Sequence, residues 1–209
     1  IIKSCKQLKF NKLKELNNIY KKKKILIYGL GKSGFSSYKF LKDKAEIYLF
    51  DDSKKITSKF KQKTINFKKI YKFNFDIIVI SPGINLLKCK LSKFLKKNLS
   101  KIYTDLDIFY SFYKNKSITI TGTNGKSTTC QLLYDVLKKQ GFDVKLVGNI
   151  GNPILSTKNI RSKTIFVIEA SSYQLDYSKL FNSKYAAILN ISPDHLERHK
   201  TIENYVSAK

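Results

Sequence analysis

A glycine-rich stretch in the second half of the chain has the residue types that hold phosphate groups. It reads Gly122-Thr123-Asn124-Gly125-Lys126-Ser127-Thr128 and directly follows the apolar run Ser117–Thr121. Glycines allow backbone N–H groups to point at phosphate oxygens, and the N-terminus of a following helix adds positive potential. The Lys126 ammonium would neutralise the outer phosphates of a nucleotide, and the Ser127 hydroxyl would bind Mg²⁺. The stretch therefore predicts a loop that binds a nucleoside triphosphate.

One position departs from the general phosphate-loop spacing. Ile120 stands where the first glycine of that pattern is expected, so Gly122 has to make the turn instead. The alternative is a lysine-capped loop without a ligand. The apolar run before the loop and the helical pattern after it favour phosphate binding over this alternative.

A second glycine turn lies near the start of the chain. Gly29-Leu30-Gly31-Lys32-Ser33-Gly34 follows the apolar run Lys24–Tyr28, and Asp51-Asp52 ends the next apolar run. This spacing is that of the dinucleotide fingerprint, in which a diphosphate lies at a helix N-terminus and a carboxylate reaches the ribose. The pattern does not name the nucleotide. NAD(P) binding, binding of another diphosphate and a tight turn without a ligand all stay open.

Two more motifs place polar side chains where apolar runs end. Glu169 follows the run Thr164–Ile168, where a carboxylate could hold Mg²⁺ beside a phosphate loop or could be a solvated edge residue. His195 could bind a metal or cap a helix, and the presence of both histidines, His195 and His199, in one short stretch favours a function. Tyr205–Lys209, by contrast, has the pattern of a solvated helix end.

The elements that must position these residues are alternating strands and helices. Apolar runs predict strands over Lys24–Tyr28, Glu46–Phe50, Asp76–Ile80, Ser117–Thr121, Asp143–Val147, Thr164–Ile168 and Tyr185–Asn190. Helices are predicted over Ser36–Lys42, Asp105–Tyr113 and Lys126–Gln140, the last closed by Gly141. Continuous apolar runs are typical of buried parallel strands. The fold class is therefore α/β, and the lysine-rich segment 54–72 is expected at the surface.

The restart of this pattern near residue 104 predicts two successive parallel-sheet units. The first, residues 1–103, is a Rossmann-like unit, and the second, residues 104–209, is a phosphate-loop unit that is cut short. The chain begins with Ile1 and contains no methionine. We therefore expect it to be a piece of a longer protein.

Composition excludes several classes of protein. No apolar run has the length that spans a bilayer, and no signal peptide precedes the first unit, so no membrane partner is expected. Three scattered cysteines, Cys5, Cys89 and Cys130, predict a reducing compartment and hence a cytoplasmic protein. The formal charge of +26 suggests nucleic acid, but only Arg161 and Arg198 among the 41 basic residues are arginines. A spread of lysines favours a solvated surface over a nucleic-acid site.

Taken in order, the motifs resemble those of the Mur ligase family. The resemblance extends from about Lys24 to Lys209 and rests on Gly29-x-Gly31-x-x-Gly34, Ser81-Pro82-Gly83-Ile84, Gly122–Thr128, Gly148-Asn149-Ile150-Gly151, Glu169–Leu175 and Asp194–His199. It implies a three-domain enzyme, a monomer when complete, whose first domain binds a UDP-linked substrate and whose second binds ATP and Mg²⁺. The form of the motifs favours members that join D-glutamate to UDP-N-acetylmuramoyl-L-alanine for cell-wall synthesis.

The resemblance also implies a role for each motif residue. The first turn would hold the diphosphate of UDP rather than NAD, and the UDP-linked substrate would contact Gly29, Leu30, Lys32, Ser33, Asp51, Asp52, Ser81, Pro82, Gly83 and Asn149. ATP would lie on Gly122–Thr128, and the catalytic residues would be Lys126, Glu169, His195 and Lys209. Ser127 and Glu169 resemble ligands of the ATP magnesium, and His195 resembles a ligand of a second Mg²⁺. Lys209 matches a family lysine that reacts with CO₂ to give a carbamate, an anionic metal ligand.

Three other readings of the sequence stay open. A sibling ligase that adds another amino acid, or a relative of folylpolyglutamate synthase, would share the phosphate loop. A non-enzymatic nucleotide sensor would bind ATP without turnover, although the joint presence of Lys126, Glu169 and His195 disfavours it. A nucleic-acid-binding protein would show a steep salt dependence of affinity, but that reading leaves both glycine turns unexplained.

Overall fold

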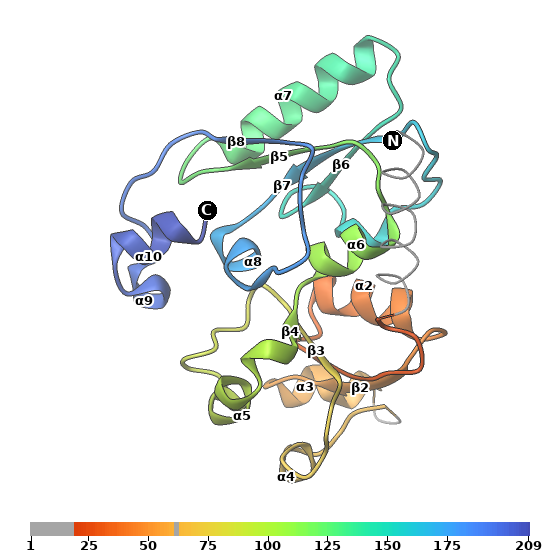
Figure 1. Ribbon diagram of the computed structural model, residues 1–209, viewed down its shortest axis with the longest axis vertical. Coiled ribbons are helices and arrows are strands. Elements are labelled where there is room, and N and C mark those ends of the chain that lie inside the picture. The colour runs from red at the N-terminus through yellow and green to blue at the C-terminus, as the bar shows by residue number, and fades with distance from the viewer. Residues whose placement is uncertain (1–18, 61–62) are drawn as a thin grey trace, which may run out of the picture.

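The computed structural model describes residues 19–60 and 63–209, which form two α/β lobes, one above the other in Figure 1. Each lobe is built on a four-stranded sheet, with strand order β2-β1-β3-β4 in the first and β6-β7-β5-β8 in the second. All strand pairs in both sheets are parallel. The prediction of two successive parallel α/β units is confirmed.

The strands of the first sheet are β1 (Lys24–Tyr28), β2 (Glu46–Phe50), β3 (Ile77–Ile80) and β4 (Ile102–Tyr103), and those of the second are β5 (Ser117–Thr121), β6 (Val144–Gly148), β7 (Ile165–Glu169) and β8 (Tyr185–Ile188). The helices are α2 (Lys32–Leu41), α3 (Lys54–Thr57), α4 (Phe67–Ile70), α5 (Ser92–Lys97), α6 (Asp105–Phe112), α7 (Lys126–Lys139), α8 (Ser172–Tyr177), α9 (Leu196–His199) and α10 (Ile202–Ser207). Short 3₁₀ turns cover Ser58–Phe60, Leu99–Lys101 and Ile154–Ser156.

Strand register brings the ends of the motif-bearing strands to one edge of each sheet. In the first sheet Tyr28 pairs with both Phe50 and Ile80, so the chain leaves β1, β2 and β3 at the same level. In the second sheet Ile120 pairs with Glu169, and Gly148 pairs with Glu169 from the other side. Ligands of parallel α/β sheets bind at this carboxyl edge.

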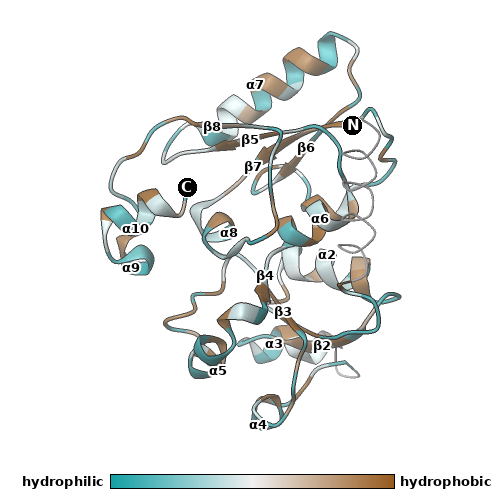
Figure 2. Cartoon of the chain, viewed as in Figure 1, coloured by the Kyte–Doolittle hydropathy of each residue, from teal (hydrophilic) through white to brown (hydrophobic). Residues whose placement is uncertain are grey.

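A shared apolar core joins the two lobes. Helices α2 and α6 lie between the sheets (Figure 1), and α6 contributes Leu106, Ile108 and Phe109 to a cluster that also contains Ile25 of β1 and Phe166 of β7. The rings of Phe109 and Phe166 are 4.8 Å apart. Figure 2 shows hydrophobic residues concentrated along the strands of both sheets. Because one cluster contains residues of both lobes, the two sheets pack against each other through a common hydrophobic core.

The expectation of uniformly buried strands is wrong for β8. Its residues are all exposed, with Tyr185 at 57% and Ile188 at 51%, and the strand ends before Asn190. It is an edge strand of the second sheet, because β5 is its only neighbour within the described residues. Apolar content alone does not separate such an edge strand from a central one.

Other differences concern the first lobe. Helix α2 begins at Lys32, not at Ser36, because Gly31 already occupies the N-cap position. Segment 54–72 is not wholly at the surface, since Ile65 and Ile70 are buried in a core cluster. Ile102–Tyr103, which is not among the predicted strands, forms the fourth strand of the sheet. These features depend on contacts with residues far away in the sequence.

Two observations bear on the predictions from composition. Cys89 and Cys130 are free thiols, and Cys5 lies outside the described residues. Among residues 19–60 and 63–209, none of the helices combines the length and the apolar character that crossing a bilayer requires.

Candidate active site

The phosphate loop joins β5 to α7, as expected, and two glycines with positive φ shape it. Gly122 has φ +145° and Gly125, the N-cap of α7, has φ +79°. A Cβ atom on Gly122 would lie 3.2 Å from Leu189 Cβ and 3.3 Å from the Asn190 backbone. Gly122 therefore makes the turn where Ile120 replaces the usual glycine, and it lets the loop lie directly on the segment that follows β8.

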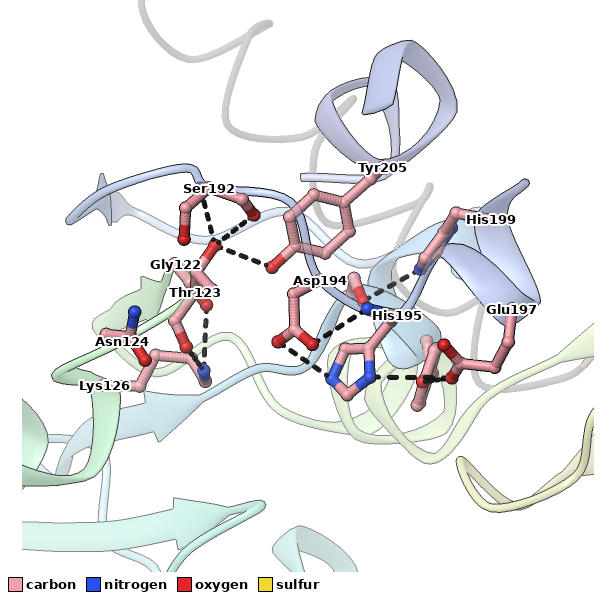
Figure 3. Close-up of polar contacts among 12 residues, drawn as sticks. Gly122, Thr123, Asn124, Lys126, Ser192, Asp194, His195, Glu197, His199 and Tyr205 are labelled. Atoms are coloured by element: carbon pink, nitrogen blue, oxygen red, sulfur yellow. Dashed lines mark hydrogen bonds and ion pairs between the residues drawn. The ribbon is translucent and has the colours of Figure 1, made fainter. Parts of the chain in front are cut away.

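That segment braces the loop through several hydrogen bonds. Asn190 accepts the Thr123 N–H at its carbonyl (3.0 Å) and the Asn124 N–H at Oδ1 (2.8 Å), and its own amide donates to the Asn124 carbonyl (3.0 Å). The Thr123 hydroxyl bonds the Ser192 carbonyl at 3.1 Å and lies 3.0 Å from the Tyr205 hydroxyl (Figure 3). Sequence reasoning missed Asn190 and Tyr205. A polar residue directly after an apolar run was the available signal for Asn190.

The Lys126 side chain extends back toward the glycine-rich loop that precedes α7. Its Nζ donates to the carbonyl oxygens of Gly122 (2.8 Å) and Thr123 (2.7 Å), and the contact with Thr123 is visible in Figure 3. The ammonium thus lies within the curve of the loop, where a phosphate group would be held. Thr128, in the first turn of α7, is exposed.

Glu169 is buried at the end of β7 and makes hydrogen bonds to neutral donors. Its exposed fraction is only 1%. One carboxylate oxygen accepts the Ser127 hydroxyl at 2.8 Å and the other accepts the Asn149 amide at 2.9 Å. It forms no ion pair with a cation in the part of the chain that the structure describes. A buried carboxylate without a cationic partner is costly, so the Ser127–Glu169 pair suits an added cation such as Mg²⁺.

His195 lines a cavity of about 340 Å³ beside the phosphate loop. The cavity is lined by Pro82, Gly83, Gly122, Lys126, Asn149, Ser171, Ser172, Tyr173, His195, Tyr205 and Lys209. The imidazole is 3.4 Å from the Asp194 carboxylate and 3.8 Å from that of Glu197 (Figure 3). His195 occupies the N-cap position of α9 but makes no capping bond with its side chain. Within the described residues, no three His, Cys, Asp or Glu side chains gather as a complete metal site.

The half-buried Lys209 contacts the phosphate loop, so the expected solvated helix end is wrong for Tyr205 and Lys209, although Val206 and Ser207 are exposed. Its Nζ donates to the Gly122 carbonyl at 2.9 Å and to the Thr121 hydroxyl at 3.2 Å, and Tyr205, one turn earlier, is 1% exposed. Burial first, and then the nearby Lys126 ammonium, lower the pKa of Lys209 to about 8. This shift leaves roughly a tenth of the amine uncharged at pH 7, far more than for an ordinary lysine, and an uncharged amine is the form that reacts with CO₂.

The first glycine turn is held in a tight shape by contacts with its own neighbours. Gly29 has φ +89°, and the Ser81 hydroxyl donates to its carbonyl at 2.7 Å. A Cβ atom on Gly34 would overlap that same carbonyl, whereas one on Gly31 would meet nothing within 4 Å. Gly29 and Gly34 are therefore required by packing, and Gly31 leaves room at the start of α2.

The acidic residues after β2 support this turn. Asp51 accepts the Leu30 N–H at 2.7 Å and the Ser53 N–H at 2.8 Å. Asp52 accepts the Tyr28 hydroxyl at 2.8 Å, and its backbone carbonyl accepts the Lys90 ammonium at 2.7 Å. The Leu30 side chain lies in the core, so only its backbone faces the turn.

A second cavity, of about 440 Å³, opens above this turn and has walls from both lobes. The first lobe contributes Gly29, Gly31, Lys32, Ser33, Asp51, Ser81, Pro82, Gly83 and Ile84, and the second contributes Gly148, Asn149, Gly151, Pro153 and Gln174. Asp52 and Leu30 are the two predicted residues of the first site that do not line it. Pro82, Gly83 and Asn149 line both cavities, so the two sites are neighbours. Gln174, which sequence reasoning missed as a site residue, is buried and bonds Asp105 at 3.1 Å.

Comparisons with known proteins agree with this two-lobe arrangement. Residues 23–102 match the family model described as Mur ligase MurD-like, N-terminal domain, and residues 120–209 match the Mur ligase middle domain. The chain is 42% identical, over 91% of its length, to UDP-N-acetylmuramoylalanine--D-glutamate ligase of Rickettsia bellii, and 40% identical, over 90%, to that of Caldicellulosiruptor bescii. It spans 43% and 44% of the length of these two relatives.

A solved structure supports the same fold. The UDP-N-acetylmuramate:L-alanyl-gamma-D-glutamyl-meso-diaminopimelate ligase from Neisseria meningitides matches with a TM-score of 0.52 at 16% identity, covering 89% of this chain and 66% of that protein. At this identity the likeness concerns the fold alone. The two family models together cover most of both lobes, including the phosphate loop, Glu169 and His195. The chain therefore belongs to the Mur ligase family.

Proposed function

We propose that the chain is the substrate-binding and ATP-binding part of an ATP-dependent ligase that joins D-glutamate to UDP-N-acetylmuramoyl-L-alanine. Residues 1–103 would form the UDP-substrate domain, and residues 104–209 would belong to the ATP domain. One observation carries the proposal. The cavity beside the phosphate loop and the cavity above the first glycine turn share Pro82, Gly83 and Asn149 as walls. The names of the curated relatives supply the choice of D-glutamate.

The ATP phosphates would lie on the loop Gly122–Thr128. Backbone N–H groups at the start of α7 would hold the phosphate oxygens, and Lys126 would exchange its two loop carbonyls for phosphate oxygens. Ser127 and Glu169 fit Mg²⁺, because the buried carboxylate has only neutral hydrogen-bond partners. When bound, Mg²⁺ would supply positive charge to the phosphate groups. His195 would contribute to a second Mg²⁺ only together with oxygen atoms of the substrate or of a modified Lys209.

The UDP part of the substrate would occupy the cavity above the first glycine turn. The open space at Gly31 and the N-terminus of α2 suit a diphosphate, with Lys32 and Ser33 beside it. Asp51 lines the cavity while it braces the turn. Asn149, which lines both cavities, would lie where the muramoyl-alanine end passes from one site to the other.

The reaction would then proceed in two steps. The alanine carboxylate attacks the γ-phosphorus of ATP, the bond to the β,γ-bridging oxygen breaks, and an acyl phosphate and ADP result. The amine of D-glutamate attacks the acyl carbon, loses a proton, and expels phosphate as the amide forms. Two anions meet in the first step, so neutralisation of charge by Lys126 and in-line positioning are the main contributions of these residues.

Lys209 would serve this site as a carbamate. Its amine lies beside the phosphate loop, and its pKa of about 8 leaves it partly uncharged near neutral pH. Reaction with CO₂ would replace the repulsion between Lys209 and Lys126 by attraction, and would provide oxygen ligands for a cation. We further propose that the complete enzyme is a cytoplasmic monomer that binds neither membranes nor nucleic acid.

Trapping the acyl phosphate tests the proposed chemistry. The full-length gene product is incubated with UDP-N-acetylmuramoyl-L-alanine, ATP, Mg²⁺ and hydroxylamine, without an amino acid. We expect the hydroxamate of the alanine carboxyl group together with an equal amount of ADP, and neither product from a Lys126→Ala variant. ADP formation without hydroxamate would mean that water receives the phosphoryl group, and would contradict the proposal.

A further inference from the structure

Arg198 connects the two lobes through a single buried side chain. It belongs to the short helix α9 of the second lobe and is 8% exposed. Its Nη1 donates to the carbonyl of Pro82 in the first lobe at 2.8 Å. Pro82 follows β3 and lines both cavities. In a chain with 41 basic residues, Arg198 is one of only two arginines.

The guanidinium also lies on an aromatic ring that several site residues share. Its Cζ is 3.8 Å from the centre of the Tyr173 ring, which itself lines the cavity beside the phosphate loop. The same ring is 4.8 Å from the ring of His195 and 5.6 Å from that of His199. Helices α8 and α9 are thus joined at Tyr173, and Arg198 extends this group of side chains to the first lobe.

The remaining polar atoms of Arg198 are poorly satisfied. Its Nε and Nη2 atoms are buried without a hydrogen-bond partner, and it forms no ion pair within residues 19–60 and 63–209. Buried donors without partners destabilise a folded protein, and apolar side chains of similar size often replace such groups without loss of stability. The stabilising contacts of Arg198 are thus confined to the Pro82 carbonyl and the Tyr173 ring, and the two unpaired donors oppose them.

We propose that Arg198 is a positioning residue that fastens the Ser81–Gly83 turn of the first lobe to the second lobe, so that the two neighbouring cavities stay in line. This inference rests on the proposed function, in which a carboxylate in one cavity must meet a phosphoryl group in the other. A displacement of about 1 Å can slow such a reaction about 100-fold. Arginine suits the task because its planar group can stack on Tyr173 while one edge donates to Pro82, which a lysine cannot do.

Two substitutions at Arg198 and two at Arg161 test the inference in the full-length enzyme. Arg198→Met keeps length and apolar contact with Tyr173, and Arg198→Lys keeps only the charge. Arg161 is the other arginine and is exposed, so Arg161→Met and Arg161→Lys are matched controls. The measurements are kcat, the separate dissociation constants of an ATP analogue and of the UDP-linked substrate, the Tm, and hydrogen exchange of the Ile84 amide, which bonds the Ser81 carbonyl.

For both Arg198 variants we expect kcat to fall about 10- to 100-fold while each dissociation constant changes less than about twofold. The Tm of Arg198→Met should equal or exceed that of the wild type, and its Ile84 amide should exchange faster than in the Arg161 variants. Unchanged kcat with unchanged Ile84 exchange would overturn the inference, as would a loss of activity explained by a lowered Tm. Hydrogen exchange of the Ile84 amide is measured without substrate. It therefore shows whether Arg198 holds the Ser81–Gly83 turn in place even if the wild-type enzyme does not use D-glutamate.

Discussion

Glu169 shows how the fold determines the surroundings of a single side chain. In the sequence it is a carboxylate after an apolar run, and such a residue taken alone is more often a solvated edge residue than a metal ligand. The structure buries it between Ser127 and Asn149, two residues from other elements. Its identity as a candidate site residue could be predicted from the motif, but its burial could not, because burial depends on strand pairing of β7 with both β5 and β6.

Removing the charge of Glu169 should weaken the binding of Mg²⁺. A Glu169→Gln variant keeps the size of the side chain but loses its negative charge, so we expect the Mg²⁺ concentration for half-maximal phosphate release to rise about tenfold or more. Glu203→Gln on the exposed face of α10 is the control. An unchanged Mg²⁺ titration in Glu169→Gln would show that this carboxylate does not hold the metal.

Lys209 should support activity as its anionic carbamate rather than as a free amine. The Lys209→Ala variant should lose activity, and short carboxylic acids such as acetate should restore part of it by supplying the missing carboxylate oxygens. Lys139→Ala, an exposed lysine at the far end of α7, should behave as the wild type. Full activity of Lys209→Ala, or a loss that no carboxylic acid restores, would refute the carbamate.

His199 should make the stability of the protein depend on pH. Burial lowers the pKa of its imidazole, which bonds the Ser172 hydroxyl at 3.0 Å. The unfolded chain therefore takes up a proton below about pH 6.5 before the folded protein does, and stability should fall as the pH decreases from that value. Urea unfolding at about pH 7 and about pH 5 should show a smaller pH effect in His199→Gln than in the wild type. Equal pH effects would contradict this assignment.

At the scale of elements, the strands were easier to predict than their ends. Lys24–Tyr28, Glu46–Phe50 and Ser117–Thr121 were predicted with the bounds that the structure has, because turn residues directly follow each apolar run. Helix α2 was predicted too short, since Gly34 has the appearance of a turn residue although it lies inside the helix. Its glycine is required by the nearby Gly29 carbonyl, which sequence patterns do not reveal.

Two glycines of the second lobe allow the cost of backbone strain to be distinguished from the cost of steric overlap. Gly148 and Gly141 both have positive φ, at +108° and +80°, but a Cβ on Gly148 would overlap the Glu169 carbonyl while one on Gly141 would meet nothing within 4 Å. Gly141→Ala should cost about 1 kcal/mol of unfolding free energy, from strain alone. Gly148→Ala should cost about 3 kcal/mol or more, because β6 must also move away from β7. Denaturant unfolding would show equal losses if packing at Gly148 were loose.

At the scale of the whole molecule, the sequence predicted two lobes but not the contacts between them. The two glycine turns and the order of apolar runs indicate two parallel sheets, which the structure has. The shared core, the common walls of the two cavities and the contact of Arg198 with Pro82 join residues that are far apart in the chain. Local patterns carry no information about such contacts. Most of the lysines that give the chain its charge of +26 have no assigned part in the site.

The central claim is that the two adjacent cavities bring a UDP-linked carboxylate to ATP for ligation to D-glutamate. Phosphate release by the full-length gene product, with UDP-N-acetylmuramoyl-L-alanine, ATP, Mg²⁺ and a panel of amino acids, tests it most directly. We predict release that requires both the UDP-linked substrate and D-glutamate, with the amide product formed in equal amount. Release that depends on a different amino acid, or that needs no amino acid at all, would contradict the claim.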